Sequence, residues 1–260
     1  MELTIIKKED NKLIFTLDKI NPTIANTIRR ATMFETPCLA IDTVTFKKND
    51  SALYDEILAH RLGFVPIKTD LKSFNTKDTC KCKGEGCALC ELKFTLKAQG
   101  PSVIYASELK SKDPKCIPVY PEMPIVNLLP NKKLELEATA TFDIGKNHTK
   151  FSPCLTYYRT YPKINLNNYN DQAAFDVCPK KVFKFDKKLE IANLENCDLC
   201  NSCVEISNNK IEIIPSREKF IFFLESWGQL TPKEILTKSM SILNDKLDEF
   251  QKKFKKAKSV

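Results

Sequence analysis

The densest group of metal-binding residue types in the sequence lies in a short loop rich in lysine and glycine. It contains Cys80, Cys82, Cys87 and Cys90, with Gly84 and Gly86 in its turn. Glycine adopts the left-handed backbone conformations that a tight reversal needs, so the loop can bring its four sulfurs together. Four thiolates form the closed tetrahedral shell of a structural zinc site, which leaves no position open for a reactive water. A cysteine-rich loop without metal is the alternative.

A second group of cysteines lies about a hundred residues later. Cys178 is followed by Pro179, and Cys197, Cys200 and Cys203 are spaced by two residues. Bacterial ferredoxins repeat the pattern C-x2-C-x2-C-x3-C-P, in which the fourth cysteine of each repeat ligates the cluster of the other repeat. The second group can therefore be aligned with that repeat position by position.

On this template, Cys178 takes the fourth position of a first repeat whose other positions hold Asn168, Asp171 and Ala174. The second repeat keeps its first three cysteines and has Ser207 in the fourth position. By the crossing rule, the chain keeps every ligand of one cluster and has lost those of the other. The pattern predicts one iron–sulfur cluster, with 4Fe–4S favoured over 3Fe–4S. Zinc on the same four thiolates is the alternative.

Catalytic residue patterns are poorly represented. The chain has two histidines, His60 and His148, and six glycines, without a phosphate-binding glycine motif or a nucleophile elbow. The isolated Cys38, Cys116 and Cys154 are typical of small buried hydrophobic residues. We therefore predict that this chain has no active site of its own.

The overall composition indicates a globular protein of the reducing cytoplasm. Eleven cysteines in a chain without a secretory leader are more typical of metal sites than of disulfides. No apolar run approaches the roughly 20 residues of a membrane helix. The net charge is +8, but 36 of the 41 basic residues are lysine. Because arginine is the better reader of bases and phosphates, we expect no direct DNA recognition.

The periodicity of the chain predicts an α+β fold. Strands are expected over residues 1–20 (as a pair), 39–46, 92–98, 133–142 and 218–225. Helices are expected from Asn21-Pro22-Thr23, with Thr23 as the candidate cap, to Pro37; from Tyr54 to Leu62; and after Thr231. Five prolines between residues 113 and 130 predict an ordered loop there.

The last helix has a narrow apolar seam. Thr231-Pro232-Lys233-Glu234 is a capping box with proline at the first helical position. Spacings of four and three residues separate Leu236, Met240, Leu243, Leu247, Phe250 and Phe254. Such a seam favours packing against another long helix, and we expect a partner chain to provide it. Packing on the chain's own core is the alternative.

Three stretches resemble signature sequences of the RNA polymerase alpha-like subunits. They are NPTIANTIRRA at residues 21–31, followed by Thr36-Pro37 and Leu39-Ala40-Ile41; DEILAHRLGFVPI at 55–67; and FLESWG at 223–228. The ferredoxin-like insertion narrows the resemblance to the archaeal branch of this family, the alpha-like subunits of archaeal RNA polymerases. That branch is related to the bacterial alpha N-terminal domain and to the third-largest eukaryotic subunit.

The resemblance implies a domain organisation. A dimerisation domain is expected from residues 1–43 and 216–260, with an inserted β-rich domain at 44–162 that carries the zinc loop at 78–92. A ferredoxin-like iron–sulfur subdomain is expected at 163–215. The Cys80 to Cys90 set resembles the zinc loop of the eukaryotic relative.

The resemblance also implies partners. The family pairs with subunit L, recruits subunits N and P, and docks on the second-largest subunit, which seeds assembly of the polymerase. The implied interface comprises Ile24, Ile28, Arg29 and Arg30 together with the seam of the last helix. Catalysis is expected from the nucleotidyltransferase complex as a whole, and this chain is expected to contact DNA only indirectly, through that complex. An iron–sulfur electron-transfer subunit of an oxidoreductase is the first alternative, and a zinc-dependent nucleic-acid binder is the second.

Overall fold

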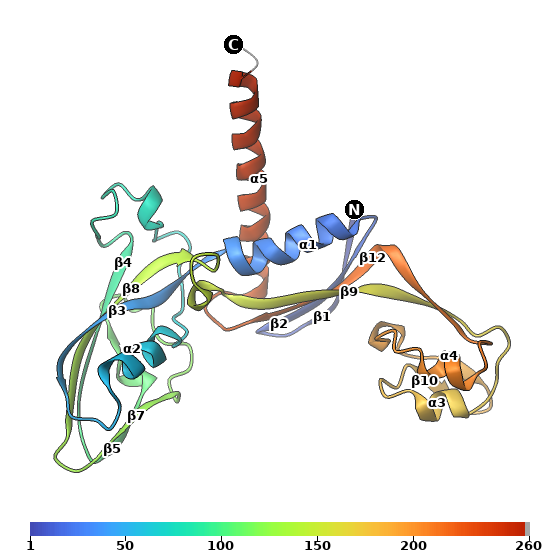
Figure 1. Cartoon of the computed structure of the whole chain (residues 1–260), viewed down its shortest axis with the longest axis horizontal. Coiled ribbons are helices and arrows are strands. Elements are labelled where there is room, and N and C mark those ends of the chain that lie inside the picture. The colour runs from blue at the N-terminus through green and yellow to red at the C-terminus, as the bar shows by residue number, and fades with distance from the viewer. Residues whose placement is uncertain (258–260) are drawn as a thin grey trace. The chain divides into compact units, whose positions relative to one another are not determined.

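The computed structural model describes residues 1–257 and confirms the α+β class (Figure 1). The chain divides into two compact units. The first joins Met1–Arg29 to Thr156–Leu224, and the second joins Arg30–Leu155 to the residues from Glu225 onward. The three-part division implied by the resemblance stays a prediction.

The first unit contains a four-stranded sheet that joins the first two strands of the chain to two strands from its second half. Its order is β1 (Glu2–Lys8), β2 (Lys12–Asp18), β12 (Glu212–Ser226) and β9 (Cys154–Asn165). β2 and β12 pack their aromatic side chains together, with Phe15 stacked on Phe222 at a centroid distance of 5.1 Å. β1 forms an edge of the sheet and is exposed along its whole length. β9 is a long strand that lies outside all the expected strands.

Helix α1 (Pro22–Arg30) follows the first hairpin. Its cap is Asn21, whose side-chain oxygen accepts a hydrogen bond from the backbone N–H of Ile24 at 2.9 Å, so the expectation of Thr23 was wrong. The α-helix also ends earlier than Pro37. Residues Ala31–Glu35 form a π-helical turn, η1, closed by a bond from the N–H of Thr36 to the carbonyl of Ala31 at 3.2 Å.

The cysteine-rich segment of the first unit folds as a small subdomain. Its elements are α3 (Ala173–Val177), β10 (Phe183–Phe185), β11 (Leu189–Ile191), η5 (Leu194–Asn196) and α4 (Ser202–Ile206). They enclose a separate core that includes Val182, Phe183, Ile211, Cys197 and Cys203. Two of the predicted cluster ligands are therefore fixed by packing.

The second unit is built on a sheet of order β3 (Pro37–Asn49), β8 (Lys133–Ile144), β4 (Glu91–Gln99) and β6 (Lys110–Ser111). A two-stranded ribbon pairs β5 (Ser102–Tyr105) with β7 (Pro124–Leu128), and short turns lie at η2 (Lys77–Thr79), η3 (Ala106–Glu108) and η4 (Thr149–Phe151). Helix α2 (Asp55–Gly63) adds Leu58 and Leu62 to a core that includes Phe94. β7 corrects the expectation of a loop throughout residues 113–130, because proline is tolerated as the first residue of a strand.

Helix α5 (Pro232–Ala257) closes the second unit. The predicted capping box is confirmed, because Glu234 N–H donates to Thr231 Oγ1 at 3.3 Å and Thr231 N–H donates to Glu234 Oε2 at 2.9 Å. Ile235 and Ser239 are buried, and η1 packs against the helix. Lys246 forms an ion pair with Glu35 at 2.7 Å. No helix in the described part of the chain is long and apolar enough to cross a bilayer.

Removing the cap should destabilise the second unit. Thr231→Ala deletes the hydroxyl that accepts from the third helical N–H, and such losses cost about 1 kcal/mol. Chemical denaturation monitored by circular dichroism measures the change. Thr237→Ala, at an exposed mid-helix position, is the matched control and should be neutral or slightly stabilising. Equal effects of the two substitutions would contradict the capping role.

Candidate metal centres and partner surface

The loop between η2 and β4 brings its four cysteine sulfurs together. The Sγ atoms of Cys80 and Cys87 are 3.5 Å apart, those of Cys82 and Cys90 3.6 Å, and those of Cys87 and Cys90 3.8 Å. All four sulfurs lie within 4.8 Å of one another. A tetrahedron with a zinc–sulfur bond of about 2.3 Å has sulfur–sulfur edges of about 3.8 Å. The thiols therefore already have the spacing that one tetrahedral ion requires.

Backbone turns hold this arrangement. The N–H of Lys83 donates to the carbonyl of Cys80 at 3.0 Å, and the N–H of Cys90 donates to that of Cys87 at 3.0 Å. Gly84 and Gly86 have φ values of 91° and 94°, where a side chain would be strained. At Gly86 a Cβ atom would also lie 2.7 Å from the Glu91 carboxylate. The two glycines are thus required for the reversal, as the sequence indicated.

One of the four cysteines in the metal-free loop has a lowered pKa, which favours the thiolate form that binds a cation. The pKa of Cys82 is lowered to about 6, first by its hydrogen bond with the neighbouring thiol of Cys80 and further by the N–H groups of Gly84 and Gly86. Burial raises the pKa of Cys90 to about 12. Cys82 would supply a metal ion with a thiolate already formed at neutral pH, whereas Cys90 would have to lose its proton to become a ligand.

The second predicted ligand set is assembled from three segments of the small subdomain. Cys178 follows α3, Cys197 follows η5, Cys200 shortly precedes α4, and Cys203 lies in the first turn of α4. All four line one small cavity, and Cys200 is the exposed member. Among the described residues, only the Cys80 loop has three or more such ligand atoms all within 4.8 Å of one another. The second set is therefore more widely spaced than a single ion needs.

The electrostatics of the second set show that its thiols share one environment. Burial, and then the nearby Cys178, Cys197 and Cys200, raise the pKa of Cys203 to about 11. The position where a ferredoxin repeat would have its next cysteine is occupied by Ser207, which is buried. Its hydroxyl donates to the carbonyl of Val204 at 2.9 Å and accepts from the N–H of Ile211 at 3.0 Å. This position serves the local fold.

The remaining cysteines and the histidines have structural surroundings. Cys38, Cys116 and Cys154 are buried, as predicted. Cys38 Sγ donates to the carbonyl of Phe151 at 3.0 Å. The His60 ring packs edge-on against Phe64 at 5.1 Å, and His148 Nδ1 accepts from the N–H of Lys150 at 3.1 Å.

The residues expected at a partner interface differ in exposure. On α1, Ile24 is 44% exposed, whereas Ile28 is buried in the chain's own core, and Arg29 donates to Asn26 Oδ1 at 2.9 Å. On α5, Leu236, Met240 and Leu243 are half-buried, and Arg30 at the end of α1 is exposed. Leu247 and Phe250 are 62% and 65% exposed, and Phe254, which stacks on Phe250, is 51% exposed.

Comparison with known proteins gives consistent matches over nearly the whole chain. The family model described as the RNA polymerase Rpb3/RpoA insert domain matches residues 40–153. The chain is 38% identical to DNA-directed RNA polymerase subunit Rpo3 of Methanosphaera stadtmanae, over 95% of this chain and 96% of that protein. It is 35% identical to subunit Rpo3 of Archaeoglobus fulgidus, over 96% and 97%. With subunit Rpo3 of Pyrococcus horikoshii the identity is 32%, over 96% of both.

We expect the Cys80 loop to bind one zinc ion with an affinity that falls as pH falls. Thiols bind metal as thiolates, so protons compete with zinc. The decline should steepen below a pH of about 6, where Cys82 also becomes protonated. Zinc titration against a chromophoric chelator over a pH series measures this. Cys87→Ser should remove one zinc ion per chain, and Cys116→Ala, outside the loop, should remove none; an unchanged zinc stoichiometry in Cys87→Ser would contradict this site.

Proposed function

Because the chain belongs to the Rpo3 family of archaeal DNA-directed RNA polymerase subunits, we propose that it is a non-catalytic assembly subunit that forms a heterodimer through α5. The observation that carries the proposal is the exposed apolar seam on the distal half of this helix. In this role the chain works in the cytoplasm, contributes no active site and meets DNA only through the complex.

The seam has the pattern of a protein interface and supplies part of its area. Leu247 and Phe250 are each more than 60% exposed, at 62% and 65%. Full burial of one such side chain contributes about 1.5–3 kcal/mol. Because association costs about 4–15 kcal/mol, these two residues cannot hold a partner alone. The interface must therefore extend along Met240 and Leu243 and onto further surface of the chain.

The proposed partner is the small alpha-like subunit L of the polymerase. A spacing of four and three residues is matched by a second helix that crosses at the shallow angle of a coiled coil. The heterodimer then recruits subunits N and P and docks on the second-largest subunit, which seeds assembly for transcription. Arg29 and Arg30, at the end of α1, are the proposed contacts to the large subunits.

The two cysteine sets have different proposed metals. The Cys80 loop, with sulfurs 3.5–3.8 Å apart along three edges, suits one structural zinc ion. The set of Cys178, Cys197, Cys200 and Cys203 is spaced more widely around one cavity and suits one iron–sulfur cluster, 4Fe–4S or 3Fe–4S, in which several metal atoms separate the thiolates. Both would act as cross-links that stabilise their surroundings.

An electron-transfer subunit of an oxidoreductase is not favoured. The matched relatives are named polymerase subunits, and the first of them covers 95% of this chain. The sequence offers one complete thiolate set where a two-cluster ferredoxin has two.

Replacing apolar seam residues should prevent heterodimer formation. Leu247→Glu with Phe250→Glu would place two charges in the interface, and losing two buried side chains should weaken binding about 100-fold or more. Co-expression with subunit L followed by size-exclusion chromatography with light scattering measures the stoichiometry. Lys252→Glu, on the face of α5 opposite the seam, changes the net charge equally; it is the matched control and should retain a 1:1 complex. If the wild-type chain stays monomeric with subunit L, the proposal fails.

Iron and zinc should be separable by substitution. Cys200→Ala removes an exposed ligand of the wider set and should cost the iron and its visible absorption, while one zinc ion per chain remains. Elemental analysis of anaerobically purified protein measures both metals. Cys116→Ala is the control and should retain both. Loss of zinc together with iron in Cys200→Ala would show that the cysteines are partitioned differently.

A further inference from the structure

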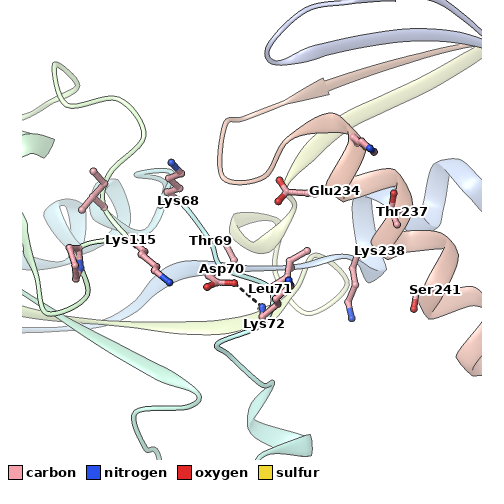
Figure 2. A pocket seen from close by; sticks show the side chains of 13 residues that line it. Lys68, Thr69, Asp70, Leu71, Lys72, Lys115, Glu234, Thr237, Lys238 and Ser241 are labelled. Carbon is pink, nitrogen blue, oxygen red and sulfur yellow. Dashed lines mark hydrogen bonds between the residues drawn. The ribbon is translucent and has the colours of Figure 1, made fainter.

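A wide groove in the second unit gathers lysines from three separate segments. It is lined by Lys68, Lys72, Lys115, Lys233 and Lys238, and we call it the lysine groove. Figure 2 shows the loop at residues 68–72 and the residue 115 side chain on one side, and the first turns of α5 on the other. The cavity has a volume of about 1010 Å³, which is large enough for a peptide segment.

The positive charge of the groove is only partly neutralised by its own carboxylates. Two carboxylates line it with the five lysines, which leaves three positive charges. Each carboxylate also accepts hydrogen bonds from residues close to it in the sequence. Asp70 accepts hydrogen bonds from the Lys72 N–H and the Ser73 hydroxyl, each at 2.9 Å, and Glu234 belongs to the α5 capping box. Among the ion pairs of the described residues, none joins a lysine of the groove to a carboxylate.

The groove also offers apolar surface. Leu71 is half-buried at its wall, Pro114 is exposed, and Ile117 is 47% exposed. A phosphate backbone offers charge but no apolar groups, and the groove contains lysine without arginine. An acidic peptide that also carries apolar side chains complements both features.

We propose that the lysine groove binds an acidic, partly apolar segment of another polymerase subunit. This inference rests on the proposed function, because it assumes that the chain works inside the complex. It concerns a surface separate from the seam. At about 100° per residue, the groove face of α5 is centred about 140° around the helix from Leu243, Leu247 and Phe250. A partner on the seam would therefore leave the groove open.

Charge reversal on the loop side of the groove tests the proposal without altering α5. Lys68→Glu, Lys72→Glu and Lys115→Glu are combined, and all three side chains are exposed. The matched control combines Lys110→Glu, Lys146→Glu and Lys163→Glu, which are also exposed, lie outside the groove and change the net charge equally. The probe is a fluorescent synthetic peptide of about 15 residues that alternates Glu or Asp with Leu or Phe.

We expect the full-length chain, as its heterodimer with subunit L, to bind this peptide. The groove variant should weaken binding about tenfold or more, and the control variant should change it less than about twofold. The peptide with its acids replaced by lysine should prefer the groove variant. Equal losses in both variants, or duplex DNA competing as well as the acidic peptide, would overturn the proposal.

Assembly of the polymerase provides the second measurement. The groove variant should keep its 1:1 complex with subunit L but lose about tenfold or more in incorporation into a complex reconstituted from purified subunits. A photo-crosslinker at Thr237 should attach to an acidic segment of another subunit in the wild-type complex. Normal incorporation of the groove variant would overturn the proposed role of the groove and leave the proposed assembly function standing. Failure of the wild-type heterodimer refutes the proposed function instead.

Discussion

The apolar side chains on the distal half of α5 remain largely exposed, although the same helix is held firmly at its start. Ile235 and Ser239 are buried, Thr231 and Glu234 cap the first turn, and η1 packs against the helix. Leu247 and Phe250 continue the apolar pattern where their exposure exceeds 60%, at 62% and 65%. The free energy available from covering them is released only by a partner, and the proposed assembly role depends on this constraint.

Repulsion between neighbouring thiolates means that the cysteine sets, like the seam, are stabilised fully only when a partner binds. Four sulfurs held 3.5–3.8 Å apart along three edges cannot all ionise without a cation between them. The loop stabilises a thiolate at one position, Cys82, through the hydrogen bond from the Cys80 thiol and the N–H groups of Gly84 and Gly86. The small subdomain separates its thiols more widely and fixes Cys197 and Cys203 within an apolar core. Sulfur spacing therefore distinguishes the two cysteine sets, which the number of cysteines alone does not.

Local signals predicted the parts of the structure that depend on neighbouring residues. The capping box, the end of α2 near Gly63 and the reversal at Gly84 and Gly86 each follow from residues a few positions apart. Features that depend on distant partners were missed. β9 has polar side chains on both faces and is specified by pairing with β12 across the sheet. The lysines of the groove come from three segments, of which the start of α5 lies more than 100 residues after the other two. No single window of sequence contains either feature.

Anchoring one end of α5 gives both proposed surfaces a fixed geometry. Because the first turns are capped and buried, the seam and the lysine groove lie on different faces of a helix whose rotation is set by Ile235 and by the Lys246–Glu35 ion pair. A preorganised surface loses less conformational entropy on binding, so a modest apolar seam can still support a stable complex. The two proposed interfaces should respond differently to salt. Moderate salt weakens the attraction between the groove lysines and acidic groups, because the screening length is about 10 Å at 0.1 M ionic strength, and it has little effect on the burial of apolar area at the seam. Salt should therefore separate the two interfaces in one complex, weakening the contact at the groove while the seam holds.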